Sequence, residues 1–404
     1  MLFEKVIQST RKEQVYTKES CVYLFRGIHI VGIRFPKTRF AILLMLYLWS
    51  ICVNLSVTIY FPTGFLLSYI YYIKEFTPGQ FLTSLQVAIN VWGCSSKIII
   101  MAFMVKHFND SEISMDKLDA RCMLPEEQLK IRKLVALGNK IVLVLAASYW
   151  SYSTSTFFTS VFNGRPPYSI YIPFMNWRDS NREFFVQALI EFCQIYFACF
   201  QQVVLDSYPV IYISILRTHL QILAKRVSTL GQNMNDLTGN ERCEELIQCI
   251  LDHKNILELF NTISPVISAT IFVQFLIMGC ILGITLMNIM IFADISDIVA
   301  SMFYIIAVMF ETFPCCYYAN CMMDDSDGLA SSIFHSFWIE QDQRYKNMLL
   351  FYMQNTQKTL TLTAMKLFPI TMGSNLNVSE MNLNDLKMFF IYIFIVKCKS
   401  LHTD

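Results

Sequence analysis

The chain has 404 residues, of which 54% are hydrophobic and only 16% are charged, and its formal net charge is +1. Soluble domains usually carry about 25% charged residues, and domains that bind nucleic acids are usually strongly basic. The composition therefore argues against both classes and predicts that the chain lies in a lipid bilayer, with no nucleic acid partner.

Seven mostly apolar runs follow one another along the chain, and a membrane helix needs about 20 such residues. The runs are 41–60, 80–105, 141–162, 184–216, 260–293, 298–323 and 348–378. They are too long for barrel strands and lack the alternation of such strands. The sequence predicts an all-α fold, a seven-transmembrane helical bundle that forms one membrane domain.

Two of these runs, 184–216 and 260–293, are too long for one perpendicular crossing of a hydrocarbon core about 30 Å thick. The segment between them, 217–259, keeps apolar residues at helical spacing among its charges. We therefore expect both helices to continue beyond the membrane into the cytoplasm.

Lys and Arg are distributed unequally between the two sides that the runs define. Residues 1–40 hold eight of them, 106–140 hold seven and 217–254 hold five, whereas the opposite loops hold four in total. Cytoplasmic loops of membrane proteins are enriched in Lys and Arg, so the N-terminus is predicted to be cytoplasmic. Seven crossings then place the C-terminus outside the cell.

Four acidic or basic residues lie within the first six runs, where a charge is costly and often functional. Lys97 either extends its amine to the membrane surface or pairs with Asp206 or Glu311, which are also placed in inner halves of their helices. In both cases its role is structural. Glu191 lies nearer the outside, where it either lines a wet cavity or bonds within the bundle.

Aromatic residues with small or hydroxyl-bearing neighbours gather in the outer halves of the second to sixth runs. Such surroundings suit a small volatile ligand, because apolar burial supplies affinity and a few polar groups orient the molecule. Ordinary helix packing and an interfacial aromatic belt would give a similar pattern. The candidate pocket residues are Val87, Val91, Tyr149, Tyr152, Ser153, Thr156, Phe192, Tyr196, Phe303 and Tyr304.

The seventh run, 348–378, is more polar than the others and should not face lipid on all sides. A helix that lines a pore at a subunit interface would meet this requirement, and so would a cytoplasmic helix with a short re-entrant segment. The candidates for a pore or anchor helix are Gln354, Thr363, Lys366, Thr371 and Ser374.

No constellation of catalytic or metal-binding residues emerges from the sequence. The His residues have no Cys or carboxylate at ligand spacing, the 13 Cys residues show no paired pattern, and the chain has neither a Gly-rich phosphate loop nor a nucleophile elbow. We therefore expect no metal, no cofactor and no enzymatic activity.

Short motifs recur in a fixed order along the chain. They are the stretch 62–85, Leu118-Asp119-x-Arg121-Cys122, Gly164-Arg165-Pro166-Pro167, Asp206-Ser207-Tyr208-Pro209, Asp252-His253-Lys254, Phe313-Pro314-x-Cys316 and Lys366-Leu367-Phe368-Pro369-Ile370. Together they resemble the insect odorant receptor family, and in particular its fly branch. Each motif is weak alone, but their order and spacing make the resemblance specific from about Tyr23 to Val378.

The resemblance implies an odorant-tuned subunit that gates a cation channel as a hetero-tetramer with a common co-receptor, in the plasma membrane of olfactory neuron dendrites. It implies small volatile ligands such as esters, bound among the outer halves of helices two to six. Helices four to six and the start of seven would form a cytoplasmic anchor, and the end of helix seven would line the pore. The segment 379–404 departs from the family pattern and is expected to be an atypical tail.

Three other classes of membrane protein are alternatives. A gustatory receptor would share the topology, but its Thr-Tyr-x-x-x-x-x-Gln-Phe pattern in helix seven is missing. A G-protein-coupled receptor would carry Asp-Arg-Tyr and Asn-Pro-x-x-Tyr motifs and would have its N-terminus outside the cell. A secondary transporter would show an inverted repeat, which the sequence lacks.

Overall fold

The computed structural model describes residues 14–34, 40–173, 175–230, 239–291 and 295–377. In chain order the elements are η1 (Thr17–Cys21), α1 (Val22–Val31), α2 (Phe40–Asn54), η2 (Leu55–Tyr60), α3 (Phe61–Tyr72), η3 (Ile73–Glu75), α4 (Pro78–Phe103), α5 (Val105–Asp119), α6 (Pro125–Phe162), α7 (Asn181–Ser228), α8 (Gly239–Ile291), α9 (Ile295–Phe334), α10 (Gln343–Thr356), β1 (Thr363–Ala364) and β2 (Phe368–Pro369). Apart from one short strand pair and an isolated bridge between Ile172 and Met175, the regular secondary structure of the described residues is helical, as predicted.

Six helical stretches are long and apolar enough to cross a membrane. They are Ile42–Tyr72, Pro78–Phe103, Pro125–Phe162, Asn181–Ser228, Asn240–Ile291 and Tyr304–Phe334. They correspond to the first six runs identified in the sequence. The chain is therefore a multi-pass helical membrane protein, as its composition indicates.

The first span is longer than the run 41–60, because the helix does not end before Pro62. A π turn, η2, connects α2 directly to α3, and Pro62 lies in the first turn of α3. Proline is tolerated in the first turn of a helix, where the missing N–H would have no helical partner. The stretch from Pro62 to Tyr72, expected in an outer loop, is therefore helical.

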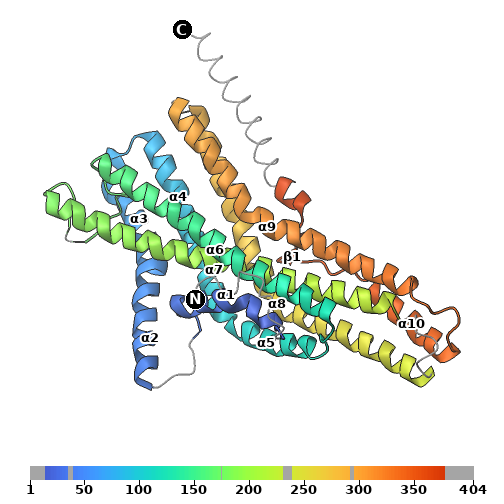
Figure 1. Ribbon diagram of the computed structural model, residues 1–404. Coiled ribbons are helices and arrows are strands. Elements are labelled where there is room, and N and C mark those ends of the chain that lie inside the picture. Colours follow the sequence, from blue (N-terminus) through green and yellow to red (C-terminus); the bar gives the residue numbers. More distant parts are fainter. Residues whose placement is uncertain (1–13, 35–39, 174, 231–238, 292–294, 378–404) are drawn as a thin grey trace, which may run out of the picture.

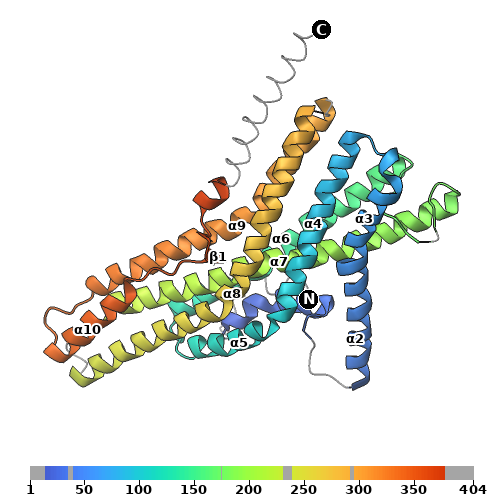
Figure 2. The same ribbon diagram turned by 180° about the vertical axis from the view of Figure 1, so that it is seen from behind.

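The two longest helices pass through the whole molecule. α7 has 48 residues and α8 has 53, which at 1.5 Å per residue gives about 70 and 80 Å. Both therefore extend beyond a membrane core, as predicted. α7 passes through the middle of the bundle in both views, with α4, α6, α8 and α9 packed against it (Figure 1, Figure 2).

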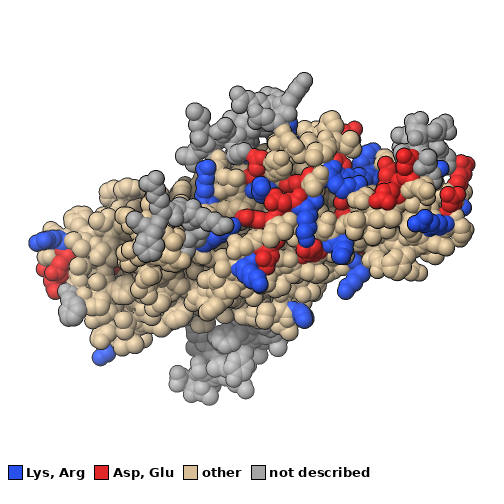
Figure 3. All heavy atoms as spheres, turned by 90° about the horizontal axis from the view of Figure 1, so that it is seen from below, with Lys and Arg blue, Asp and Glu red and all other residues tan. Residues whose placement is uncertain are grey.

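The bundle has two chemically different ends. Residues 163–180 join α6 to α7 at the upper left of Figure 1, which we call the loop end. α10 packs against α8 and α9 at the opposite end, which we call the α10 end. Charged side chains gather towards the α10 end, whereas the surface near the loop end is mainly uncharged apart from its tip (Figure 3). This distribution fits a bilayer around the loop-end part of the bundle.

The seventh run, 348–378, does not form one helix, and that part of the prediction is wrong. α10 ends at Thr356, the antiparallel pair β1–β2 follows, and residues 372–377 are helical again. Met365 and Lys366 have positive φ in the turn between the strands, a conformation outside the right-handed helical region. The run is also rich in β-branched Thr, which favours extended backbone.

Candidate functional site

An aromatic wall lines the facing sides of α6 and α7 near the loop end. The Trp150 ring stacks on Tyr196 at 5.3 Å between ring centroids and on Phe200 at 6.1 Å. The Phe192 ring lies 4.6 Å from Phe157 and 5.8 Å from Tyr196. Aromatic contacts of this kind fix ring positions. The predicted pocket residues Phe192 and Tyr196 thus share one apolar surface.

Four other predicted pocket residues divide between two apolar clusters. Val91 is buried in a loop-end cluster made by α2, η2, α3, α4, α7 and the 163–180 segment, and Val87 packs against that cluster. Tyr149 and Tyr304 pack against the main core of the bundle instead. The pocket at these positions stays a prediction.

Tyr152, Thr156 and Phe303 are three further members of the predicted set. Tyr152 is half exposed. The Thr156 hydroxyl donates to the Tyr152 carbonyl at 3.0 Å, so it is already used within α6. The side chain of Phe303 lies outside the described residues. For these three positions too, ligand binding stays a prediction.

Several buried polar groups on α4, α6 and α7 have no hydrogen-bond partner in the described structure. On α6 these are Trp150 Nε1 and Ser153 Oγ, which lie about one turn apart, and Ser153 is fully buried. Gln86 Nε2 on α4 and Gln194 Oε1 on α7 are also unpartnered. Folded proteins satisfy most buried polar groups, so these atoms are available to a small polar guest. Of these four residues only Ser153 is among the pocket candidates from the sequence, because the sequence around a polar residue does not show whether its side chain will find a hydrogen-bond partner.

The 163–180 segment turns back into the bundle and is held there by Glu191 of α7. Glu191 Oε2 accepts from Tyr168 N at 2.7 Å, and Oε1 accepts from Ile170 N at 3.0 Å and from Gln187 Nε2 at 2.9 Å. Of the two possibilities left by the sequence, bonding within the bundle is therefore the one observed.

The Lys97 amine is paired inside the bundle and does not extend to the membrane surface. Lys97 Nζ on α4 lies 3.3 Å from Asp206 Oδ1 on α7, and its side chain is 2% exposed. It also donates to Gln274 on α8. A charge in a low-dielectric interior needs such partners. The pairing that the sequence allowed is thus confirmed for Asp206.

The same network reaches α6 and α9. Asp206 Oδ2 accepts from Tyr149 Oη at 2.8 Å and from Gln202 Nε2 at 2.9 Å. Gln202 also donates to Glu311 on α9. Tyr149, predicted as a pocket residue, therefore links α6 to this network, which joins α4, α6, α7, α8 and α9 below the wall.

A second ionic network lies at the α10 end. Arg226 Nε is 2.6 Å from Glu127 Oε1, and Arg226 Nη1 is 2.7 Å from Asp252 Oδ2, which also pairs with Arg121. A cavity of about 10 Å³ beside His219 and Arg226 has room for about one water molecule and for no odorant-sized ligand. The motifs Leu118-Asp119-x-Arg121-Cys122 and Asp252-His253-Lys254 therefore contribute to helix packing at this end.

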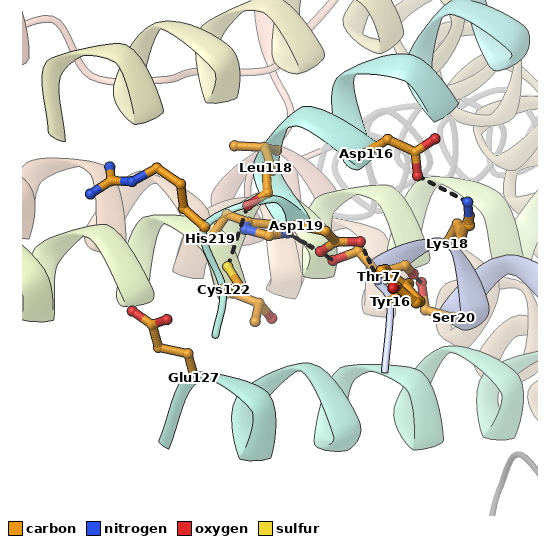
Figure 4. Close-up of polar contacts among 12 residues, drawn as sticks. Tyr16, Thr17, Lys18, Ser20, Asp116, Leu118, Asp119, Cys122, Glu127 and His219 are labelled. Atoms are coloured by element: carbon orange, nitrogen blue, oxygen red, sulfur yellow. Dashed lines mark hydrogen bonds and ion pairs between the residues drawn. The ribbon is translucent and has the colours of Figure 1, made fainter. Parts of the chain in front are cut away.

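The N-terminal segment is fastened to this end by a buried polar contact. Thr17 N donates to Asp119 Oδ2 at 2.7 Å, the Thr17 hydroxyl donates to Asp119 Oδ1, and His219 Nε2 lies 3.0 Å from that hydroxyl (Figure 4). Burial raises the pKa of Asp119 to about 6. The beginning of the described chain is thus tied to α5 and α7.

The five residues predicted for a pore or anchor helix do not share one helix. Gln354 is exposed on α10, Thr363 lies in β1, and Lys366 lies in the strand turn. The Thr371 hydroxyl accepts from Ser374 N at 3.2 Å and so caps the helix that begins at residue 372. The predicted tail 379–404 lies outside the described residues.

Comparison with known proteins identifies relatives along nearly the whole chain. A family profile described as 7tm Odorant receptor matches residues 77–382. Odorant receptor 42a and Odorant receptor 42b of Drosophila melanogaster are each 40% identical to the chain, over 94% of its length and over 92% and 95% of their own.

The fold is similar to that of the insect olfactory receptor OR5 from Machilis hrabei. The TM-score is 0.72 at 12% sequence identity, covering 93% of this chain and 98% of that one. The structure of OR5 in complex with eugenol gives a TM-score of 0.69 over 94% and 97% of the two chains. The profile match and the chain-long identity decide among the alternatives considered from the sequence. The chain belongs to the insect odorant receptor family, whose members are receptors and channels rather than enzymes.

Proposed function

We propose that this chain is the odorant-tuned subunit of a ligand-gated cation channel that assembles as a hetero-tetramer with the common co-receptor. It would act in the plasma membrane of olfactory neuron dendrites. The observation that carries the proposal is 40% identity to odorant receptors over 94% of the chain. The fold shared with an insect olfactory receptor supports it.

The ligand would be a small volatile molecule that binds at the loop end, against the aromatic wall. Apolar contact with Trp150, Phe192 and Tyr196 would supply affinity, and the unpartnered polar atoms of Trp150 and Ser153 would orient the molecule. Esters are the first class to test, because their oxygens accept hydrogen bonds. The similar OR5 fold has been observed in complex with eugenol, which supports a small organic ligand.

Exposed apolar side chains at the α10 end support assembly with other subunits. Ile339, between α9 and α10, is 71% exposed, and Phe351 of α10 is 65% exposed. These residues lie outside the six candidate spans, where lipid tails would not cover them. Apolar surface in such a place usually meets a protein partner. A co-receptor subunit packed against this end would bury it.

The proposed topology has seven crossings, with the N-terminus in the cytoplasm. The seventh crossing would begin with the helix at residue 372, which places Thr371 and Ser374 at the mouth of the pore. Gln354, Thr363 and Lys366 would then belong to the cytoplasmic anchor. Tags at the two ends of the chain, probed on intact and permeabilised cells, would test this: the C-terminal tag alone should be labelled on intact cells.

The function is tested by recording membrane current in cells that express the chain with and without the co-receptor, during a screen of small esters, ketones and alcohols. We expect a rapid cation current only with both chains. Silence of chains that reach the surface, followed by recovery when 379–404 is replaced by a family-like helix, would locate the fault in the tail. Silence in both forms would contradict the proposed function.

A further inference from the structure

The 163–180 segment forms an inner surface of the loop end and is more than a covering loop. Ile170 is buried in the cluster that contains Phe61 and Phe65 of α3. Tyr171 N donates to the Gly64 carbonyl at 3.4 Å, and Tyr60 Oη donates to the Tyr171 carbonyl at 3.0 Å. These contacts hold the segment against α3 from one side.

Glu191 holds the same segment from the side of α7. Its two oxygens accept three N–H groups, two of them from the backbone of Tyr168 and Ile170. The carboxyl is fully buried, and within the described residues no Lys or Arg forms an ion pair with it. Gln187 completes the clamp by donating to the Ile170 carbonyl at 3.0 Å. The buried Glu191 carboxyl is therefore explained by its hydrogen bonds to the backbone of Tyr168 and Ile170.

The side chain that the clamp positions is Tyr168. Its ring meets Phe61 and Phe65 edge-on, at 6.1 and 5.9 Å between centroids. Its hydroxyl is buried and has no hydrogen-bond partner in the described structure. Burial, followed by the nearby Tyr152 of α6 and then Cys199, Glu191 and Tyr304, raises the pKa of Tyr168 well above its ordinary value. A tyrosine hydroxyl is neutral at physiological pH even at its ordinary pKa, so Tyr168 keeps a hydrogen to donate.

We propose that Tyr168 donates a hydrogen bond to an oxygen of the bound odorant, and that Glu191 is a positioning residue that fixes the Tyr168 backbone. This rests on the proposed function and names the ligand class more narrowly, as volatiles with a carbonyl or ether oxygen. Trp150 Nε1 on the aromatic wall is a second unpartnered donor. Donors without partners select acceptors, since a pure hydrocarbon would leave them unsatisfied.

The test is the variant Tyr168→Phe, expressed with the co-receptor. The agonists from the screen are graded by the acceptor strength of their oxygen, and current is recorded against concentration. We expect potency to fall about five- to tenfold for the strongest acceptors and little for the weakest, as loss of one hydrogen bond predicts. An equal loss for all agonists, or no loss, would overturn the proposal.

Two tyrosines offer matched controls. Tyr60→Phe removes a hydroxyl that holds the same segment through the Tyr171 carbonyl, so any loss of potency should be equal across the series. Tyr71→Phe alters a residue that is 61% exposed and stacked on Tyr171 at 4.5 Å, and should change nothing. If either control variant lost more potency for strong acceptors than for weak ones, the effect would not be specific to the Tyr168 hydroxyl, and the proposal would fail.

Glu191→Gln tests the positioning role, because an amide oxygen can accept from only one side of the clamp. We expect Glu191→Gln to weaken the dependence of agonist potency on acceptor strength. The double variant with Tyr168→Phe should show the same dependence as Tyr168→Phe alone. A uniform loss that adds to that of Tyr168→Phe would mean that Glu191 has a folding role only.

A second readout separates this proposal from the channel function. The odorant-induced rise in melting temperature of the purified chain reports binding without gating. If wild type gives no current yet esters stabilise it more than they stabilise Tyr168→Phe, the channel proposal fails and the Tyr168 proposal stands. If wild type gives current and the two forms are stabilised equally, the Tyr168 proposal fails alone.

Discussion

The Lys97–Asp206 pair allows a quantitative test of the membrane interior. Asp206→Leu would leave the Lys97 amine, 2% exposed, without its counter-ion. It would also free Tyr149 and Gln202, whose donors now reach Asp206 at 2.8 and 2.9 Å. Removal of one partner from a buried pair costs about 3–5 kcal/mol, and each lost hydrogen bond within a membrane about 0.6 kcal/mol. We therefore expect Asp206→Leu to lose about 4–6 kcal/mol of folding free energy.

Adding Lys97→Met to the same chain should recover part of this loss, because the unpaired ammonium is then gone. An apolar replacement of a whole buried pair is often neutral. The double variant should thus be more stable than Asp206→Leu alone. The assay is thermal unfolding of purified receptor in detergent, supported by the fraction of protein at the cell surface.

A solvent-exposed pair supplies the control. Lys117 Nζ lies 2.9 Å from Glu258 Oε1 with both side chains nearly half exposed, so Lys117→Met should cost at most about 1 kcal/mol. Additive costs for Lys97→Met and Asp206→Leu, or a cost no larger than that of the control, would refute the view that the buried pair organises the bundle.

Three further predictions concern packing and charge. Burial raises the pKa of Asp119 to about 6, so between about pH 4 and pH 6 the folded protein holds a proton that the unfolded chain releases, and its stability should fall as the pH rises through this range. Asp119→Asn should flatten this part of a plot of melting temperature against pH. An unchanged slope in the variant would contradict the raised pKa of Asp119. A Cβ at Gly93 would lie 1.8 Å from Ile277 Cδ1, so Gly93→Ala should cost about 1–3 kcal/mol in thermal unfolding, and Ile277→Ala in the same chain should restore stability if this contact is the cause. Arg226→Met would strand the carboxylates that it now bridges and should cost about 3–5 kcal/mol, visible as loss of receptor at the cell surface; normal surface levels would show that the network is dispensable.

The sequence allowed the class of fold and the pairing of Lys97 to be predicted for physical reasons. Long uncharged runs must be helical in lipid because every backbone group needs an internal partner. A Lys within such a run needs a counter-ion, and only a few carboxylates lay at the same depth. Asp206 was one of two named in advance.

Other features depend on contacts between distant segments and could not be read locally. The first run was predicted to end at residue 60, but the π turn Leu55–Tyr60 leads directly into α3 and the helix continues. The seventh run, 348–378, was predicted to be a helix from its length and mostly apolar content, whereas the positive φ at Lys366 belongs to a turn. Tyr168 was not singled out, because its importance follows from where Glu191 holds its backbone.

Part of the aromatic surface on α7 could be predicted from the sequence. Phe192 and Tyr196 do form one wall, since aromatic residues one turn apart on a helix share a face. The partners of that wall, Trp150 and Phe200 among them, depend on how α6 packs against α7. The spacing of aromatic residues predicts which face of a helix is apolar, but it does not predict which neighbouring helix packs against that face.

The most direct test of the account is an electron cryomicroscopy structure of the complex with the co-receptor, bound to its most potent ester. We predict ligand density between the α6–α7 aromatic wall and the 163–180 segment, with a ligand oxygen within hydrogen-bond distance of Tyr168 Oη. Ligand density at the α10 end or between subunits, with the loop end empty, would contradict the account.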